Sequence, residues 1–319
     1  MRDALLSADG RERTVPLRLS IQLCTYNRAR LLERVLEACF DQTLAKDDYE
    51  VVLVDDGSSD DTPDVIERAA RLATCRFTVV RQVNGGLANA RNAGIARCTG
   101  ARIAFIDDDV LPTPVFAAEH LASDARHGDV VVRGAAINTA SFDALPLPVW
   151  TPRHYSANWF WTTNVSVRRT RLDAAGGRFD ESFSEYGWED IELGLRLRAI
   201  GTKAVFNPRA LVFHYKPPPK AANVEGMLRQ ARAQARTAVR LAQLHPRWRV
   251  ALAIGDTAPQ RALGGLLART PVHGRLQRIV RDAPDDAAAL PRTQRFAARL
   301  LAAAAYYDEL AKAKRSTAR

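Results

Sequence analysis

Cysteine is scarce in this sequence of 319 residues, and its spacing argues against a disulfide scaffold or a zinc finger. The four cysteines, Cys24, Cys39, Cys75 and Cys98, are far apart and form no CxxC pair. Because each one stands in an apolar stretch, we expect buried, reduced thiols. A reducing cytosol is the compartment that suits them.

Long apolar runs are also missing. The first twenty residues contain Arg2, Arg11, Arg13 and Arg18 and lack the apolar core of a signal peptide. No stretch approaches the roughly 20 apolar residues that a membrane-spanning helix needs. The sequence therefore predicts a cytoplasmic protein that is neither secreted by a signal peptide nor transmembrane.

Charge is divided unevenly along the chain. Residues 1–220 hold 28 Lys/Arg and 29 Asp/Glu, whereas residues 221–319 hold 18 and 7, which places the whole net charge of +10 in the C-terminal third. Three consecutive prolines at 217–219 favour an extended spacer at this boundary. We expect an N-terminal extension (1–16), a main domain (17–216) and a basic helical region (217–319).

The basic region carries a cationic helix face. Within residues 227–244, arginines recur at three- and four-residue steps, at Arg229, Arg232, Arg236 and Arg240. Such a face is either simply solvated or suited to an anionic membrane surface or an acidic partner. The second interpretation predicts peripheral contact with the inner face of the membrane.

The main domain alternates strand and helix patterns. Residues 19–24, 50–54, 77–80 and 102–106 read as strands, and residues 30–40, 62–72 and 87–97 place apolar side chains at helical spacing. Repeated strand–helix units favour a mostly parallel sheet with helices on both faces. Ligands of such α/β sheets bind beyond the carboxyl ends of the strands.

Polar clusters stand at three of these strand ends, and the most informative is the run of aspartates 107–109 after the apolar residues 103–106. On an extended segment Asp107 and Asp109 would face one side and Asp108 the other. Paired carboxylates suit Mg²⁺ or Mn²⁺ with phosphate oxygens in the remaining positions. A solvated acidic turn is the competing interpretation.

The other clusters suggest a nucleotide. Asp56 can accept a hydrogen bond from a base, with Thr25 or Asn27 completing the recognition of the base edge, although Asp-Asp-Gly-Ser is also a common turn. Asn84 opens a loop with two glycines, and Arg91 follows it as a cation suited to diphosphate.

Six segments in this order resemble the family 2 glycosyltransferases of the GT-A fold. They are Thr25 to Arg28, Gln42-Thr43, Val54 to Ser58, Asn84 to Gly94, Asp107 to Asp109, and Gly187 to Asp190, and together they span roughly residues 17–216. The resemblance implies one α/β domain with a mixed, mostly parallel sheet. It also implies inverting transfer of a sugar from a nucleotide-diphosphate sugar, with UDP favoured by its frequency in the family and dTDP and GDP left open.

The resemblance assigns roles to individual residues. It implies that Asp56 contacts the base, Asp107 the ribose and Asp109 a Mn²⁺ or Mg²⁺ ion, and that Asp190, with Glu189 beside it, is the general base. The carboxylates of Glu189 and Asp190 stand in the first turn of a predicted helix, where the helix dipole alone would also favour them. The remaining donor-binding candidates are Thr25, Tyr26, Asn27, Arg28, Asn84, Arg91 and Asp108.

The resemblance places three further aromatic or polar residues, Trp161, Asn164 and Trp188, beside the acceptor. It offers His214 as a second metal ligand, while a packed histidine is the simpler alternative. The acceptor stays open among a glycan, a lipid-linked sugar, a small molecule and a protein.

Two other functions compete. A nucleic-acid-binding module would use the basic charge, but that charge lies outside the nucleotide-like domain. A sugar nucleotidyltransferase would usually carry glycines and a basic residue after the first strand, and Thr25 to Arg28 contains no glycine. The Gln-x-x-Arg-Trp motif of processive family members is missing, which favours a single addition.

Overall fold

The computed structural model of the protein describes residues 17–156, 158–269, 271–281 and 289–317, so the predicted extension at 1–16 lies outside the described residues. The strands are β1 (Leu19–Thr25), β2 (Tyr49–Asp55), β3 (Arg76–Arg81), β4 (Arg102–Phe105), β5 (Val110–Pro112), β6 (Val130–Thr139), β7 (Val165–Arg168) and β8 (Lys203–Tyr215). The helices up to β8 are α1 (Ala29–Phe40), α2 (Thr62–Leu72), α3 (Leu87–Arg97), α4 (Phe116–His127), the short 3₁₀ helix η1 (Pro152–His154), α5 (Arg169–Ala174) and α6 (Glu189–Ala199).

The eight strands form one mixed sheet in the order β3-β2-β1-β4-β7-β6-β8-β5. The pairs β2–β3, β1–β2, β1–β4 and β6–β8 are parallel, and β4–β7, β6–β7 and β5–β8 are antiparallel. The predicted mixed, mostly parallel sheet is confirmed. Because β1, β2 and β4 run in parallel, the polar residues that follow them meet at one edge of the sheet.

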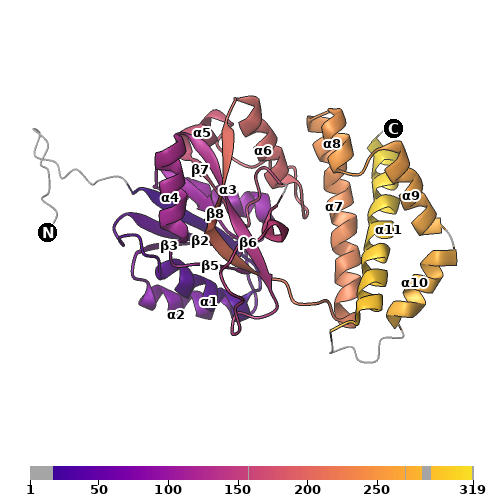
Figure 1. Ribbon diagram of the computed structural model, residues 1–319, viewed down its shortest axis with the longest axis horizontal. Coiled ribbons are helices and arrows are strands. Elements are labelled where there is room, and N and C mark those ends of the chain that lie inside the picture. The colour runs from indigo at the N-terminus through magenta and orange to yellow at the C-terminus, as the bar shows by residue number, and fades with distance from the viewer. Residues whose placement is uncertain (1–16, 157, 270, 282–288, 318–319) are drawn as a thin grey trace, which may run out of the picture.

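Helices cover both faces of this sheet (Figure 1). Side chains alternate along each strand, so Val51 and Leu53 of β2 pack with α1, α2 and α4, while Val52 packs with α3, α5 and α6. All three are fully buried. Burial on both faces explains why these strands read as continuous apolar runs.

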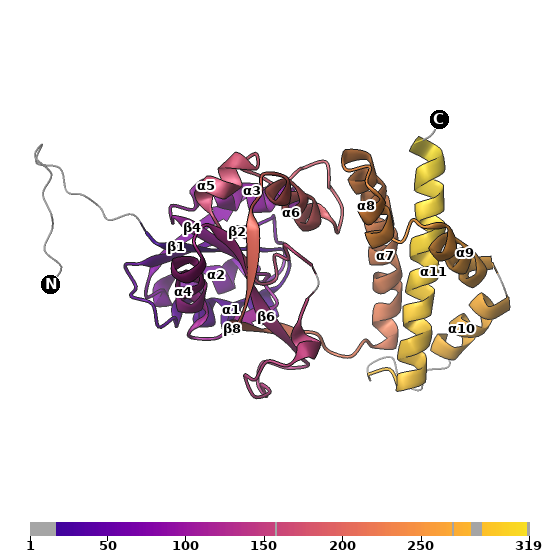
Figure 2. The ribbon, with the colours of Figure 1, turned by 45° about the horizontal axis from the view of Figure 1, so that its top comes forward.

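The chain continues after β8 into a group of helices, which are η2 (Ala221–Asn223), α7 (Val224–Leu244), α8 (Trp248–Ala253), α9 (Ala258–Arg269), α10 (Pro271–Arg281) and α11 (Arg292–Thr317). Helices α7 and α11 lie side by side in both views, with α9 and α10 on the far side of α11 from the sheet (Figures 1 and 2). One hydrophobic cluster contains Phe183 from the sheet domain together with Ala238 of α7 and Leu310 of α11. The two parts therefore pack on each other, and the predicted division at residue 216 stays a prediction.

The cysteines and the longest helices can now be examined in the structure. All four cysteines are free, with Cys39 and Cys98 buried and Cys24 and Cys75 partly buried. Among the residues that the structure describes, no helix is long and apolar enough to cross a membrane.

Candidate active site

A cavity of about 730 Å³ lies beyond the carboxyl ends of β1, β2 and β4. It collects fourteen of the predicted site residues from elements distant in the chain. These are Thr25, Tyr26, Arg28, Asp56, Asn84, Arg91, Asp107, Asp108, Asp109, Trp161, Trp188, Glu189, Asp190 and His214. The order of strands in the sheet thus brings the separate motifs to one place.

The three aspartates occupy a turn, which corrects the expectation of an extended segment. Strand β4 ends at Phe105, and the Val110 N–H donates to the Asp107 carbonyl oxygen at 3.2 Å. The turn sends the three carboxylates to three different partners instead of alternating sides. Among the described residues, no group of three or more His, Cys, Asp or Glu side chains gathers as a ready-made metal cage.

Asp108 is the inward-facing member of this turn. Its carboxylate accepts a hydrogen bond from Thr25 Oγ1 at 2.8 Å and lies 3.8 Å from Arg28 Nε. Burial raises the pKa of Asp108 to about 7, against the pull of the Arg28 charge. Asp108 therefore ties the end of β1 to the acidic turn.

Asp109 faces the end of β8. Its Oδ1 lies 3.4 Å from His214 Nε2, and Lys216 lines the same part of the cavity. Burial alone would raise the pKa of Asp109, but the hydrogen bond and charge of His214, together with the charges of Lys216 and Arg28, hold it below its ordinary value. Asp109 is thus kept as a carboxylate beside an imidazole nitrogen.

Asp56 organises the glycine loop before α3. Its carboxylate accepts hydrogen bonds from the backbone N–H groups of Gly85 and Gly86, at 2.9 and 3.0 Å, and from Gln82 Nε2 at 2.7 Å. Gly57 beside it has φ +82°, and a Cβ there would stand 2.8 Å from the Asn84 backbone nitrogen. The close approach of these loops requires glycine. The contact of Asp56 with a base stays a prediction.

Arg91 is a buried cation that is already paired within the chain, and its contact with a diphosphate stays a prediction. It is buried, and its guanidinium donates to Glu189 Oε1 at 2.6 Å, to Asp107 Oδ1 at 3.2 Å and to Thr162 Oγ1 at 2.6 Å. Burial would lower the pKa of Arg91, but the charges of Glu189 and Asp107 raise it above its ordinary value. The positive charge of Arg91 is therefore neutralised by two carboxylates of the cavity wall.

Replacing Arg91 with methionine should strip both carboxylates of their partner. Loss of one side of a buried ion pair costs about 3–5 kcal/mol, so we expect a fall of that size in the free energy of unfolding, measured by denaturant titration. The matched control is Arg68→Met, which breaks a half-exposed contact with Glu33 and should cost less than about 1 kcal/mol. Equal losses in the two variants would contradict a central role for Arg91.

Glu189 and Asp190 begin α6 but have different surroundings. Both line the cavity, but Glu189 is buried against Arg91, whereas Asp190 is partly exposed and accepts a hydrogen bond from the Ile191 N–H at 2.7 Å. Burial, and then the charge of Glu189, raise the pKa of Asp190 to about 7. A carboxylate with this pKa is suited to take up a proton near neutral pH.

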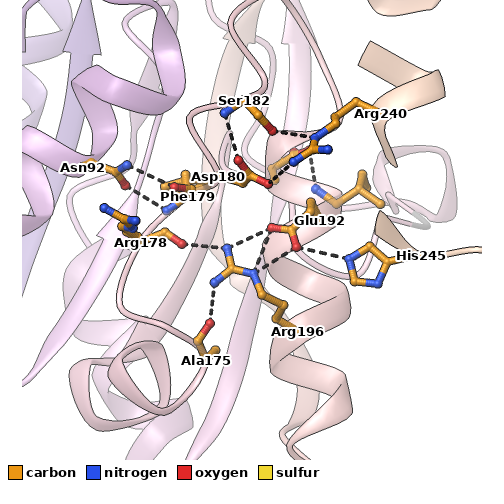
Figure 3. Close-up of polar contacts among 12 residues, drawn as sticks. Asn92, Ala175, Arg178, Phe179, Asp180, Ser182, Glu192, Arg196, Arg240 and His245 are labelled. Atoms are coloured by element: carbon orange, nitrogen blue, oxygen red, sulfur yellow. Dashed lines mark hydrogen bonds and ion pairs between the residues drawn. The ribbon is translucent and has the colours of Figure 1, made fainter. Parts of the chain in front are cut away.

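The segment that leads into α6 is fixed from two sides. Figure 3 shows Asn92 of α3 paired with the Phe179 backbone, and Arg240 of α7 reaching Ser182 and Asp180. The same view shows Arg196 of α6 donating to the backbone oxygens of Ala175 and Arg178 while it pairs with Glu192, which also contacts His245, the residue that follows α7.

Helix α7 also binds the next stretch of this segment. Arg236 pairs with Glu185 at 2.5 Å, and the Trp188 indole N–H donates to the Gln234 carbonyl oxygen at 2.9 Å. Trp188 has φ +74°, a strained value for a residue with a side chain, and these contacts hold it. Because Arg236 and Arg240 face the sheet domain, the predicted cationic face is partly occupied by carboxylates of this chain.

Two predicted site residues lie outside the cavity. The Asn27 side chain accepts hydrogen bonds from the backbone N–H groups of Ser59 and Asp60, and so shapes the loop before α2. Asn164 is buried, and its amide donates to the carbonyl oxygens of Ala135 and Ala210. Both amides are engaged by the backbone and neither lines the cavity, and their roles in donor and acceptor binding stay predictions.

The cavity contains residues that no motif indicated. Lys216 is the last residue of the predicted main domain, and Gln230 and Gln234 lie in the helix that the sequence marked only by its arginines; all three line the cavity. Thr163 supports the site by donating from Oγ1 to Asp107 Oδ2 at 2.7 Å. Only the helical spacing of Gln230 and Gln234 could have placed these two on one face.

Comparison with known proteins gives one consistent picture. Residues 20–171 match the model of the family described as Glycosyl transferase family 2. Validoxylamine A glucosyltransferase of Streptomyces hygroscopicus subsp. jinggangensis (strain 5008) is 33% identical over 223 aligned residues, covering 59% of this chain and 52% of that protein. Chondroitin synthase of Escherichia coli is 25% identical over 243 residues, covering 63% of this chain and 35% of that protein. The chain spans about half the length of the first curated relatives it matches.

Solved structures resemble the fold over more than nine tenths of this chain. The mannosyltransferase PcManGT from Pyrobaculum calidifontis, in complex with GDP-Man and Mn²⁺, has a TM-score of 0.56 at 21% identity and covers 91% of this chain and 88% of its own. S. aureus TarS in complex with UDP-GlcNAc has a TM-score of 0.57 at 17% identity and covers 94% of this chain and 92% of its own. Over residues 20–171 this chain is therefore similar to glycosyltransferase family 2, and it has the GT-A fold of the solved structures that it resembles.

Proposed function

We propose that this protein is an inverting, metal-dependent glycosyltransferase that moves one sugar from a nucleotide-diphosphate sugar to an acceptor hydroxyl. The observation that carries the proposal is the presence of Asp190, with its pKa raised to about 7, in the cavity that also contains Asp109, His214 and Lys216. The reaction needs a base that accepts the acceptor proton and positive charge that stabilises the departing diphosphate.

The donor set at Asp109 and His214 fits Mn²⁺ or Mg²⁺. A carboxylate oxygen and an imidazole nitrogen lie 3.4 Å apart, and His214 Nδ1 is buried without a hydrogen-bond partner in the described part of the chain. Two protein ligands leave positions for the diphosphate oxygens of the donor. When bound there, the metal would neutralise the charge that develops on the departing diphosphate.

The chain's own residues supply the rest of the mechanism. Asp190 accepts the proton of the acceptor hydroxyl while that oxygen attacks the anomeric carbon, and the bond to the diphosphate breaks on the opposite side of the sugar. A single displacement of this kind inverts the anomeric configuration. Lys216 adds positive charge at the end of the cavity near Asp109. Arg91 holds Glu189 and Asp107 in place.

The donor belongs to the class that the similar proteins bind. Two of the similar solved structures are complexes with GDP-Man and with UDP-GlcNAc. We propose a UDP-sugar, with GDP and dTDP sugars as the alternatives to be tested. The acceptor-side role of Trp161 and Trp188 is part of this proposal, because both line the cavity. Contact of the basic helices with anionic membrane stays a prediction.

A hydrolysis screen tests the function. Nucleotide sugars that differ in base and sugar are incubated with Mn²⁺, with Mg²⁺ or with EDTA, and release of the nucleoside diphosphate is measured. We expect slow release from at least one donor, with metal and not with EDTA, since water can replace the acceptor. Absence of release from every donor, or equal release in EDTA, would contradict the proposal.

A further inference from the structure

We propose that the α7 wall of the cavity is an acceptor subsite for a neutral, polyhydroxylated molecule, a sugar or a polyol, and that Gln230 and Gln234 determine this specificity. The inference rests on the proposed function, because it names the acceptor class of the same site. It concerns a helix beyond residues 20–171, the part that matches the family model.

The two glutamines share one face of α7. They are four residues apart, so their side chains lie one helical turn from each other, and both line the cavity. Neither side-chain amide has a hydrogen-bond partner within the described ranges, although the backbone carbonyl oxygen of Gln234 accepts from Trp188. Two amides are therefore free to bind a ligand from this wall.

This wall adjoins the proposed base. A Cβ on Gly187 would stand 3.0 Å from Gln234 Cγ, which shows how closely α7 approaches the residues just before α6. Tyr186 and Trp188 line the cavity on either side of Gly187, and Asp190 follows two residues after Trp188. A molecule held by the glutamines thus lies near the carboxylate that would take its proton.

The chemistry of the wall selects the ligand class. Each amide offers donors and an acceptor, which matches the double character of a hydroxyl group, and the aromatic faces of Tyr186 and Trp188 suit the C–H faces of a sugar ring. Two cations of α7 are already paired, Arg236 with Glu185 and Arg240 with Asp180, and neither lines the cavity, so an anionic acceptor gains little from them. A purely apolar alcohol would leave both amides unpaired.

The test compares acceptors by the ratio of transfer to hydrolysis. The full-length protein is given the donor found in the hydrolysis screen together with maltose and sorbitol as neutral polyhydroxylated probes, glucose 6-phosphate as an anionic probe, or 1-octanol as an apolar probe. Formation of the glycosylated product and release of free sugar are measured in the same reaction. We expect transfer to a neutral probe and little transfer to the other two.

Three variants separate the glutamines from the rest of the helix. Gln230→Ala and Gln234→Ala should each lower the ratio of transfer to hydrolysis about tenfold, because each removes an amide that binds acceptor hydroxyls. The matched control is Gln243→Ala, an exposed glutamine of the same helix that does not line the cavity, and it should behave as the unaltered protein. Melting curves check that all three are folded.

The possible results distinguish a wrong acceptor class from a wrong enzymatic function. Donor hydrolysis with transfer only to glucose 6-phosphate or 1-octanol, or with no transfer to any probe, overturns this inference and leaves the proposed glycosyltransferase function standing. The inference is also wrong when Gln230→Ala and Gln234→Ala keep the ratio of the Gln243→Ala control. Failure of every donor to hydrolyse contradicts the function itself.

Discussion

Replacement of Asp190 by asparagine should lower turnover by about 10²–10⁴-fold and at the same time raise thermal stability. The amide keeps the shape of the side chain and an oxygen that accepts from the Ile191 N–H, but it cannot take up the acceptor proton. Turnover is measured under single-turnover conditions and stability by a melting curve on the same preparation, while calorimetry reports donor binding, which should change little.

The gain in stability follows from the raised pKa of Asp190. Because the pKa is about 7 in the folded protein and lies near its ordinary value of 3.8 in the unfolded chain, the folded state binds more protons between these two pH values. Stability therefore falls as the pH rises from about 4 to about 7. The variant avoids this loss, so we expect a gain on the order of 1 kcal/mol above pH 7 and little difference near pH 4.

The activity of the unaltered protein should follow the same group. The rate at low acceptor concentration should rise with pH through about 7, where Asp190 becomes a carboxylate. Glu189→Gln is the matched comparison, since it breaks the 2.6 Å charge pair with Arg91 and should lower stability by about 1–3 kcal/mol. If Asp190→Asn instead melts lower and turns over normally, Asp190 is only a helix-end residue.

Replacement of Asp109 by alanine should abolish transfer and remove metal-dependent nucleotide binding while leaving the fold intact. Asp109 is the carboxylate that faces His214, so its loss removes one of two proposed protein ligands. We expect metal affinity to fall by more than the roughly 10–100-fold that loss of an outer partner costs. Titration of Mn²⁺ against the protein with nucleotide present measures this affinity directly.

Two further variants define the metal site. His214→Ala should also lower metal affinity when the imidazole is a ligand, whereas a packed histidine predicts unchanged affinity and lower stability. The control is Asp143→Ala, which removes a carboxylate that is exposed on the surface and should alter neither property. Full activity of Asp109→Ala, or undiminished activity of the natural protein in EDTA, would rule out the metal-bridged mechanism.

Much of the sheet could be predicted from the sequence because its first half repeats one local pattern. Strands β1, β2 and β4 are short apolar runs with polar ends, and α1 and α2 carry apolar residues at helical spacing. Strands β5, β6 and β7 were not predicted, since they pair through antiparallel or distant partners and no strand–helix repeat marks them. The pairing of β6 with β8, some seventy residues later, depends on tertiary contacts.

Most residues of the candidate site could be predicted from the sequence, but the contacts between them could not. Asp107 to Asp109 were recognised as a cluster, but the turn closed by the Val110 N–H gives each carboxylate a different partner instead of the expected alternation. Arg91 has the charge of a diphosphate ligand, and only its burial between Glu189 and Asp107 shows its structural role. Lys216 belongs to no motif, so the sequence did not indicate it. It comes close to Asp109 because β8 pairs with β5.

The two-part construction of the cavity has a thermodynamic consequence. The sheet domain and α7 form opposite walls, and the covalent connection between the two parts passes through the prolines at 217–219. A molecule that contacts both walls contributes its binding free energy to their association as well as to its own retention. An acceptor that contacts Gln234 and the sheet domain together would therefore stabilise the packing of α7 on that domain, and by the same linkage a change that weakens this packing would weaken the binding of the acceptor.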